Sequence, residues 1–360
     1  LMVALGAASA APDKPYRSPL DVAFAPDGQH LAVSDRTAGE VLLVRPGKGR
    51  LEAKISLHGQ PRGIVWSSDG EKLYVAEYGA GTVAEVDADK KAVTRRLSVG
   101  LYPRGLALVE NAGLLLAANA ATHSVSAVEL GSGHEKKRID VARAPLSIAI
   151  DAGRSRALIS NQLPAGPANA ADHASVVSIL DLKTLTISKQ IHLPPGSTNA
   201  RDVAIGANGR WAYVVHSLGR TGVPLTQFAR GWVMTHALSI IDLKNTKRYA
   251  TVLLDHLTEG AADPWDVAPS KDGKRLWITL SATHELARIK LARLHRYLKG
   301  GLPDDHPITR KKNNPKGATN IWVEIKRDPS RRQDLVNRLS SLYTVDLIKR
   351  LPLPGKGPRG

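Results

Sequence analysis

The apolar residues of this chain form short runs that return at a regular spacing. The runs are four to six residues long and are separated by Gly, Pro, Asp and Asn, which favours short strands joined by tight turns over helices. Four strand-like runs per unit are typical of one blade of a β-propeller. A proline opens each of the first four units, and successive prolines lie 42 residues apart, at Pro19, Pro61, Pro103 and Pro145.

Each proline starts a similar phrase, and the phrase identifies later units that are spaced more widely. Pro-Arg-Gly stands at Pro61 and Pro103, and related phrases begin at Ala200 and Pro264. Asp-Gly or Asn-Gly turns follow several phrases, as expected between neighbouring antiparallel strands. The pattern predicts an all-β propeller over residues 17–360, made of four-stranded antiparallel blades at about 17–59, 60–100, 101–142, 143–197, 198–261 and 262–353.

The last residues repeat the opening of a unit once more, because Gly357 to Gly360 reads Gly-Pro-Arg-Gly. The sequence therefore predicts six blades and the start of a seventh. A blade buries both of its faces against neighbouring blades. We accordingly expect the intact protein to continue past this point and to close a ring of seven blades.

Residues 1–10 resemble the end of a secretory signal peptide. A short apolar run leads to Ala8-Ser9-Ala10, which has the A-x-A pattern of a cleavage site. No later stretch approaches the ~18 apolar residues that a membrane helix needs. We expect an exported protein, periplasmic or extracellular, with no transmembrane segment.

Three insertions interrupt the repeat. Residues 163–173 and 217–235 fall between the second and third strands of units four and five, so both project from the face that carries the unit-opening phrases. We expect this face to bind a protein partner or an acidic ligand. The third insertion, residues 291–343, is basic and begins with a helical pattern. We interpret it as a solvated excursion, with a docking arm for an acidic partner as the alternative.

Arginines occupy one repeated position of the unit-opening phrases. Arg62, Arg104 and Arg201 share it, and Arg359 repeats it. Guanidinium groups that converge there would form a positive collar at the mouth of the central channel, suited to an anion or an acidic partner. The alternative is that each arginine pairs locally with a carboxylate, such as Glu77 or Asp202.

Two further groups of residues are candidates for binding. Glu77 and His216 end the second strand of their units, where a polar side chain can face a ligand or simply cap a turn. The 217–235 insertion contains residue types that dominate interface energies, and Trp232 is its expected main anchor. The alternative is that its aromatic rings pack the loop onto the blades. The candidates in this insertion are Phe228, Arg230 and Trp232.

The absence of cysteine limits the chemistry of the chain. It excludes a disulfide scaffold, a thiolate zinc site, a cysteine nucleophile and a Cys-x-x-Cys-His haem site within these residues. The 12 histidines show no compact metal-binding spacing, and there is no G-x-S-x-G or P-loop motif. We expect neither a metal nor a cofactor within this chain. A propeller enzyme with a site at the channel mouth, such as a lactonase-like hydrolase, remains the alternative function.

The chain is strongly basic, with 50 Lys and Arg against 33 Asp and Glu and a net charge of +17. Basic charge alone supports only non-specific nucleic-acid binding, and no aromatic residues are interleaved with the basic runs. We therefore expect no nucleic-acid partner. Basic side chains on outer strands also discourage edge-to-edge pairing of sheets.

Specific stretches resemble known bacterial proteins. Ser68-Asp69-Gly70 followed by Lys72-Leu73-Tyr74-Val75-Ala76 resembles the YVTN-type β-propeller repeat. A closer resemblance is to exported proteins that join such a propeller to a di-haem cytochrome c peroxidase-like domain. It rests on the stretches from Asn161 to Gly166, from Leu225 to Trp232 and from Leu351 to Gly360.

In that family the haem motifs follow the propeller, and this sequence ends before them. The resemblance therefore implies a propeller that accompanies a redox haem domain or partner, and it supplies no catalytic residue here. We expect an exported binding or docking module rather than an enzyme.

Overall fold

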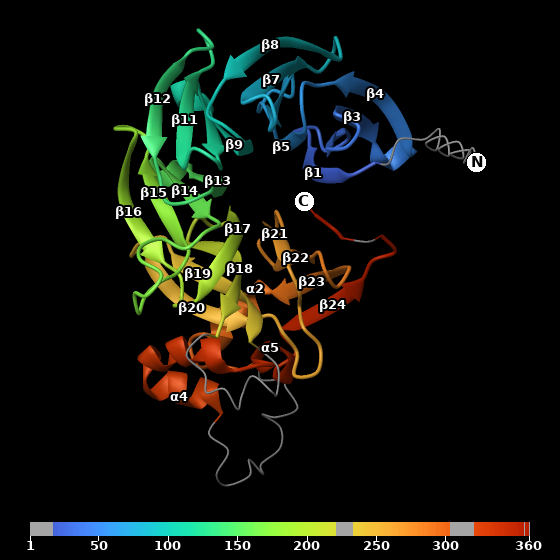
Figure 1. The fold of residues 1–360 in the computed structure, drawn as a ribbon. Helices are drawn as coiled ribbons and strands as arrows, with labels where there is room; N and C mark the ends of the chain where they lie inside the picture. Colours follow the sequence, from blue (N-terminus) through green and yellow to red (C-terminus); the bar gives the residue numbers. More distant parts are fainter. Residues whose placement is uncertain (1–16, 221–232, 303–319, 356, 360) are drawn as a thin grey trace, which may run out of the picture.

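The computed structural model describes residues 17–220, 233–302, 320–355 and 357–359. Each of the six units folds into a four-stranded antiparallel sheet in which successive strands are neighbours. Figure 1 shows the sheets arranged around a central axis, with the first strand of each sheet innermost and the fourth outermost. The all-β propeller is therefore present.

The strand bounds follow the repeat, and each of the first four units starts its inner strand at the repeated proline. Blades one to three contain β1 (Pro19–Phe24), β2 (Leu31–Asp35), β3 (Glu40–Arg45), β4 (Arg50–Ser56), β5 (Pro61–Trp66), β6 (Lys72–Glu77), β7 (Thr82–Asp87), β8 (Ala92–Ser98), β9 (Pro103–Val109), β10 (Leu114–Asn119), β11 (Ser124–Glu129) and β12 (Glu135–Asp140). Blades four to six contain β13 (Pro145–Asp151), β14 (Arg156–Asn161), β15 (Val176–Asp181), β16 (Thr186–His192), β17 (Ser197–Ile205), β18 (Trp211–Gly219), β19 (Met234–Asp242), β20 (Lys247–Leu253), β21 (Pro264–Pro269), β22 (Arg275–Leu280), β23 (Glu285–Lys290) and β24 (Ile348–Pro352). Short 3₁₀ turns join some strands, at η1 (Pro46–Lys48), η2 (Glu110–Ala112) and η3 (Ala152–Arg154).

The prediction of seven blades is wrong, because the described chain has six sheets. The described residues after β24 form no strand of a further blade. They fold back toward the axis, where the backbone N–H of Gly357 donates to Nδ1 of His284 over 2.8 Å. The guanidinium of Arg359 lies 4.4 Å from the centre of the Trp265 ring. Among the described residues this phrase, rich in Pro and Gly, pairs with no strand and packs against blade six.

Neighbouring blades are held together by apolar side chains of the inner strands. In blades two to six, the fourth residue of the unit-opening phrase packs against the preceding blade, as Ile64 does in the cluster shared by blades one and two. The same position is at most 9% exposed at Ile64, Leu106, Ile148, Val203 and Val267. In blade one this position is Val22, which is 41% exposed. Among the described strands, β21 and β1 do not pack together as the other neighbouring inner strands do.

Glycine in the Pro-Arg-Gly phrases allows inner strands to approach one another. A Cβ at Gly63 would collide with the carbonyl oxygen of Arg104, and a Cβ at Gly105 would collide with that of Leu146. Both collisions involve backbone atoms, which cannot move aside as a flexible side chain can. The glycines are thus required by packing between blades.

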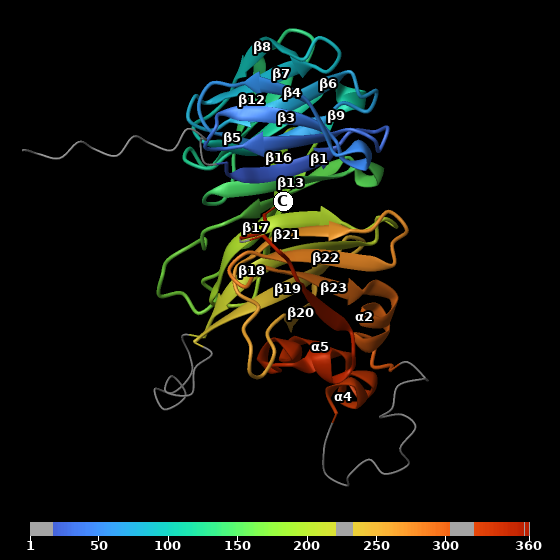
Figure 2. The ribbon, with the colours of Figure 1, turned by 90° about the vertical axis from the view of Figure 1, so that its right-hand side faces the viewer.

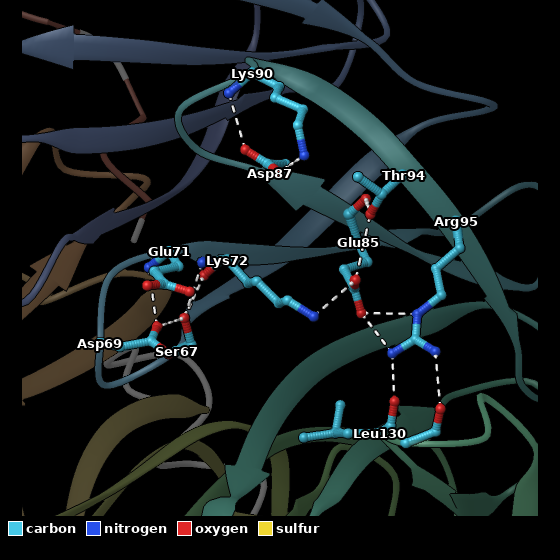
Figure 3. Close-up of polar contacts among 11 residues, drawn as sticks. Ser67, Asp69, Glu71, Lys72, Glu85, Asp87, Lys90, Thr94, Arg95 and Leu130 are labelled. Atoms are coloured by element: carbon cyan, nitrogen blue, oxygen red, sulfur yellow. Dashed lines mark hydrogen bonds and ion pairs between the residues drawn. The ribbon is translucent and has the colours of Figure 1, made fainter.

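Polar links on outer strands also join blades (Figure 3). Glu85 on β7 is only 4% exposed, and its Oε2 accepts a hydrogen bond of 2.8 Å from Nε of Arg95. Its Oε1 pairs with Nζ of Lys72 at 3.2 Å. Arg95 also donates to the carbonyl oxygen of Leu130 in blade three. Burial opposes ionisation of Glu85, yet the donors on Arg95 and Lys72 hold its pKa below the ordinary value.

The insertion in blade six packs onto the propeller in its described part, which corrects the interpretation of a solvated excursion. It contains α2 (Leu291–Tyr297), α4 (Ile321–Arg327), η4 (Pro329–Asn337) and α5 (Ser341–Thr344). Leu294, Ile325, Leu335 and Leu342 are buried in one core with blades five and six. Figures 1 and 2 place α4 and α5 beside the outer part of these blades. No helix in the described ranges is long and apolar enough to cross a bilayer.

Candidate binding site at the channel mouth

A pocket of about 190 Å³ lies where the inner strands begin. Its walls come from the second, third and fourth residues of the unit-opening phrases, so the repeat itself builds the site. The second position contributes Arg62, Arg104, Arg201 and Trp265, and the third position contributes Asp21, Asp202 and Asp266. The three arginines predicted to meet at the mouth therefore do line one pocket.

Arg62 and Arg104 share one aromatic partner. The Cζ atoms of Arg62 and Arg104 lie 4.5 Å and 5.3 Å from the centre of the Tyr78 ring. Tyr78 in turn stacks on Tyr102, with ring centres 4.5 Å apart. Arg62 is 8% exposed, and the Nε atoms of both arginines are buried without a hydrogen-bond partner. No carboxylate of the described residues forms an ion pair with either guanidinium.

The charges around Arg62 are mostly positive. Burial, helped by the nearby guanidinium groups of Arg104, Arg36 and Arg359, lowers the pKa of Arg62 to about 10. The side chain still carries its charge at neutral pH. A charged group that its surroundings disfavour in this way would be stabilised by an anion.

Arg201 differs from the other two arginines because a local carboxylate neutralises it. Its Nη2 lies 2.7 Å from Oδ1 of Asp263. Its guanidinium also stacks over Trp265 at 4.0 Å, and Arg359 stacks over the same ring at 4.4 Å. The alternative of local pairing therefore describes Arg201, although its partner is Asp263 and not Asp202.

Carboxyl groups line the same pocket and tie the blades together. Oδ2 of Asp21 accepts a bond of 2.9 Å from the N–H of Ile64 in the next blade. Oδ2 of Asp202 accepts one of 3.0 Å from the N–H of Val267, also in the next blade. Oδ1 of Asp202 accepts from the hydroxyl of Ser147 over 2.5 Å.

Burial raises the pKa values of two of these acids. It raises the pKa of Asp21 to about 6, although backbone donors oppose the shift. Burial and the neighbouring Asp202 raise the pKa of Asp266 well above its ordinary value. Burial and the neighbouring carboxyl group of Asp202 thus both favour the protonated form of Asp266. Within the described ranges, no group of three or more His, Asp or Glu side chains is placed to hold a metal ion.

Glu77 and His216 lie outside the pocket lining and bond within their own surroundings. Glu77 is fully buried, and its carboxylate accepts from Thr82 at 2.6 Å and from Arg96 at 3.1 Å. His216 is also fully buried, with Nε2 2.9 Å from the hydroxyl of Ser239. Burial lowers the pKa of His216 to about 4, so its ring is neutral at pH 7. Both arrangements match the alternative of a local structural role.

The insertion residues Phe228, Arg230 and Trp232 lie outside the described residues. The described ends of this insertion continue the sheet, since β18 and β19 pair as far as Gly219 and Met234. In the 163–173 insertion, an isolated bridge joins Ala165 to Ala174. Both insertions thus leave blades four and five between their second and third strands, on the face of the channel mouth.

From the sequence, Asp202 was expected only as a possible partner of an arginine, and Tyr78, Asp21 and Asp266 were not singled out. Asp21, Asp202 and Asp266 share the third position of the unit-opening phrases, and that shared position was the signal. Tyr78 directly follows a second strand and carries no such marker. Its contact with both arginines depends on how the loop after β6 folds between blades two and three.

Comparisons with known proteins support the fold. No protein-family model matches the chain, so the YVTN-type repeat stays a prediction. Hydrazine synthase subunit beta of Kuenenia stuttgartiensis is 29% identical over 90 residues, which make up 25% of this chain and 23% of that protein. A solved structure of Kuenenia stuttgartiensis hydrazine synthase has a TM-score of 0.77 at 19% identity, over 99% of this chain and 92% of that chain. The chain therefore spans under a quarter of the curated relative, and what it shares with the solved structure is the propeller fold.

Proposed function

We propose that this propeller is a docking module, which holds a protein partner against the face that contains the channel mouth. We further propose that the assembly includes a redox subunit with haem. Two similarities support this proposal. The relative is by its name one subunit of hydrazine synthase, and the sequence resembles propellers joined to a di-haem domain.

The observation that carries the proposal is the position of exposed apolar side chains. Leu101 and Tyr102 precede β9, Leu257 lies between β20 and β21, and Val233 and Met234 stand at the start of β19. All five belong to loops or strand ends on the mouth face, and their exposed fractions lie between 42% and 61%. Five of the eight large apolar side chains that the described residues expose therefore lie on this face, the other three being Val22, Phe24 and Leu51. Apolar groups beside arginines on one face are typical of protein interfaces.

Charge favours an acidic partner surface. The chain carries a net charge of +17, and the guanidinium groups of Arg62 and Arg104 have no acidic partner among the described residues. Association through such a surface should weaken as salt screens the charges. We also propose export from the cytoplasm, which residues 1–10 support by their pattern alone.

The test is retention of a haem protein by the immobilised chain. An extract of the source cells is passed over wild-type protein and over a Leu101→Ser, Leu257→Ser double variant, and bound proteins are stained for haem. We expect the wild type to retain a haem protein and the double variant to bind it about tenfold or more weakly, as for interface anchors.

The matched control is Leu51→Ser. Leu51 is 46% exposed but is the second residue of β4, on the opposite face. Its substitution should leave retention unchanged. Retention of no haem protein, or equal weakening by Leu51→Ser, would contradict the proposal. Thermal unfolding of each variant shows that the fold is kept.

A further inference from the structure

We propose that Arg62, Arg104 and Tyr78 form a binding site for a carboxylate group at the mouth of the central channel. This inference does not depend on the docking proposal, because it rests on the geometry of the pocket alone. Both arginines line the pocket, and Tyr78 holds them through its ring. The ligand would lie against the guanidinium groups.

The first step is that these arginines lack what buried arginines normally have. A buried guanidinium is costly unless it is paired and hydrogen-bonded. Arg62 is 8% exposed, yet its Nε has no acceptor and no carboxylate lies against it among the described residues. The Nε of Arg104 is likewise buried and has no hydrogen-bond acceptor. Arg201 provides the internal comparison, since it occupies the same repeat position and is paired with Asp263.

The second step is that the described part of the protein supplies no group of its own to fill this need. A tyrosine ring offers a cation–π contact, but it accepts no hydrogen bond in the plane of a guanidinium. Nearby Arg36 and Arg359 add positive charge. An external acceptor with negative charge is what this arrangement lacks.

The third step concerns which anion fits. The planar fork of an arginine matches the two oxygens of a carboxylate. Asp21, Asp202 and Asp266 line the same pocket, and repulsion from those carboxyl groups that are ionised grows with the charge of the ligand, so it disfavours a doubly charged anion most. The volume of about 190 Å³ admits a small ligand or one side chain. A group with a single negative charge is therefore favoured over phosphate or sulfate.

Such a carboxylate can come from a small organic acid or from the side chain of an acidic protein residue. The chemistry at the arginines is the same in both cases. The test therefore uses two probes, propionate and a five-residue peptide with blocked ends and one central Glu. Propionamide is the neutral control, and sodium sulfate at matched ionic strength is the competing anion.

The experiment follows the NMR signals of the arginine Nε–H groups of the full chain during titration. We expect propionate, the peptide or both to move the signals of Arg62 and Arg104 in a saturable way, while propionamide does not. If propionate binds, the site takes a small organic acid. If only the peptide binds, the site takes the side chain of an acidic protein residue. Arg62→Gln and Arg104→Gln should each weaken binding by about tenfold or more, the effect of losing one charged hydrogen bond.

Arg138→Gln is the matched control, because Arg138 lies on an outer strand and pairs with Glu135 at 2.9 Å. It should bind the probes as the wild type does. If Arg62→Gln does not fold, Arg104→Gln keeps the test complete, since Arg104 is more exposed. The proposal is overturned if neither carboxylate probe saturates, if folded Arg104→Gln binds as the wild type does, or if sulfate binds more tightly than both probes.

Discussion

At the scale of single residues, burial at the channel mouth changes the pKa of the acidic side chains that line it. Burial raises the pKa of Asp21 to about 6. An acid whose pKa is raised by folding favours the folded state most at low pH, and this contribution is lost as pH rises from the unfolded value of 3.8 through about 6. The charged form of Asp21 is therefore a cost to stability at pH 7.

This shift predicts the behaviour of Asp21→Asn. The difference in free energy of unfolding between Asp21→Asn and wild type should shift in favour of the variant by about 1–3 kcal/mol as the pH rises from 4 to 7. Urea unfolding at several pH values measures the change. Asp27→Asn is the control, because hydrogen bonds from Gln29 and His30 lower the pKa of Asp27 to about 2. A pH dependence of Asp21→Asn equal to that of wild type would contradict the assignment.

The arginine position could be predicted from the sequence, and its consequences could not. The repeat placed Arg62, Arg104 and Arg201 at one mouth, since one position of equivalent strands points to one place. It gave no means to see that Asp263 neutralises Arg201 while Arg62 faces Tyr78. Both partners lie in connections outside the strands, where conformation depends on neighbouring blades.

At the scale of strands, the approach of neighbouring inner strands gives a prediction for Gly63. Gly63→Ala places a Cβ against the carbonyl oxygen of Arg104, so strands β5 and β9 must separate. We expect a loss of about 1–3 kcal/mol in the free energy of unfolding, the usual cost of an overpacked contact. Chemical denaturation measures it.

Gly131→Ala is the matched control for this change. A Cβ added at Gly131 would meet no atom within 4 Å, and the backbone there has a φ that ordinary residues adopt. Its substitution should alter stability by less than about 0.5 kcal/mol. If Gly63→Ala is as mild as Gly131→Ala, the close approach of the two strands does not hold in solution.

Strands were predictable wherever the repeat was regular. In the insertions the local pattern predicted the start of the 291–343 segment as a helix, which is α2, but it did not predict how the rest packs, because contacts distant in sequence decide that. β18 and β19 continue past the expected loop boundary, and η4 packs on β20 to bury Leu335. At the final Pro-Arg-Gly phrase the repeat predicted a strand that the structure does not have. The residues resemble a strand start, but Gly357 and Arg359 bind His284 and Trp265 and form no sheet.

At the scale of the whole molecule, the ring has five strongly packed junctions between inner strands. At each of them the fourth residue of a unit-opening phrase is buried against the preceding blade. Val22 occupies this position in blade one and is 41% exposed, whereas Val203 and Val267 are 3% and 2% exposed. Residue type is the same in all three cases, so the difference lies in the junction.

This difference predicts unequal effects of one substitution at equivalent positions. Val→Thr keeps the shape of the side chain and adds a hydroxyl, which costs about 1–3 kcal/mol when it is buried without a partner. Val203→Thr and Val267→Thr should lose that much stability, because each hydroxyl would lie inside a packed junction. Val22→Thr should change the free energy of unfolding by less than about 0.5 kcal/mol, as for an exposed site. Denaturant unfolding of the three variants under one condition makes the comparison. A loss at Val22 as large as at Val203 would mean that the face of blade one is covered in solution, and that the sixth junction is as well packed as the other five.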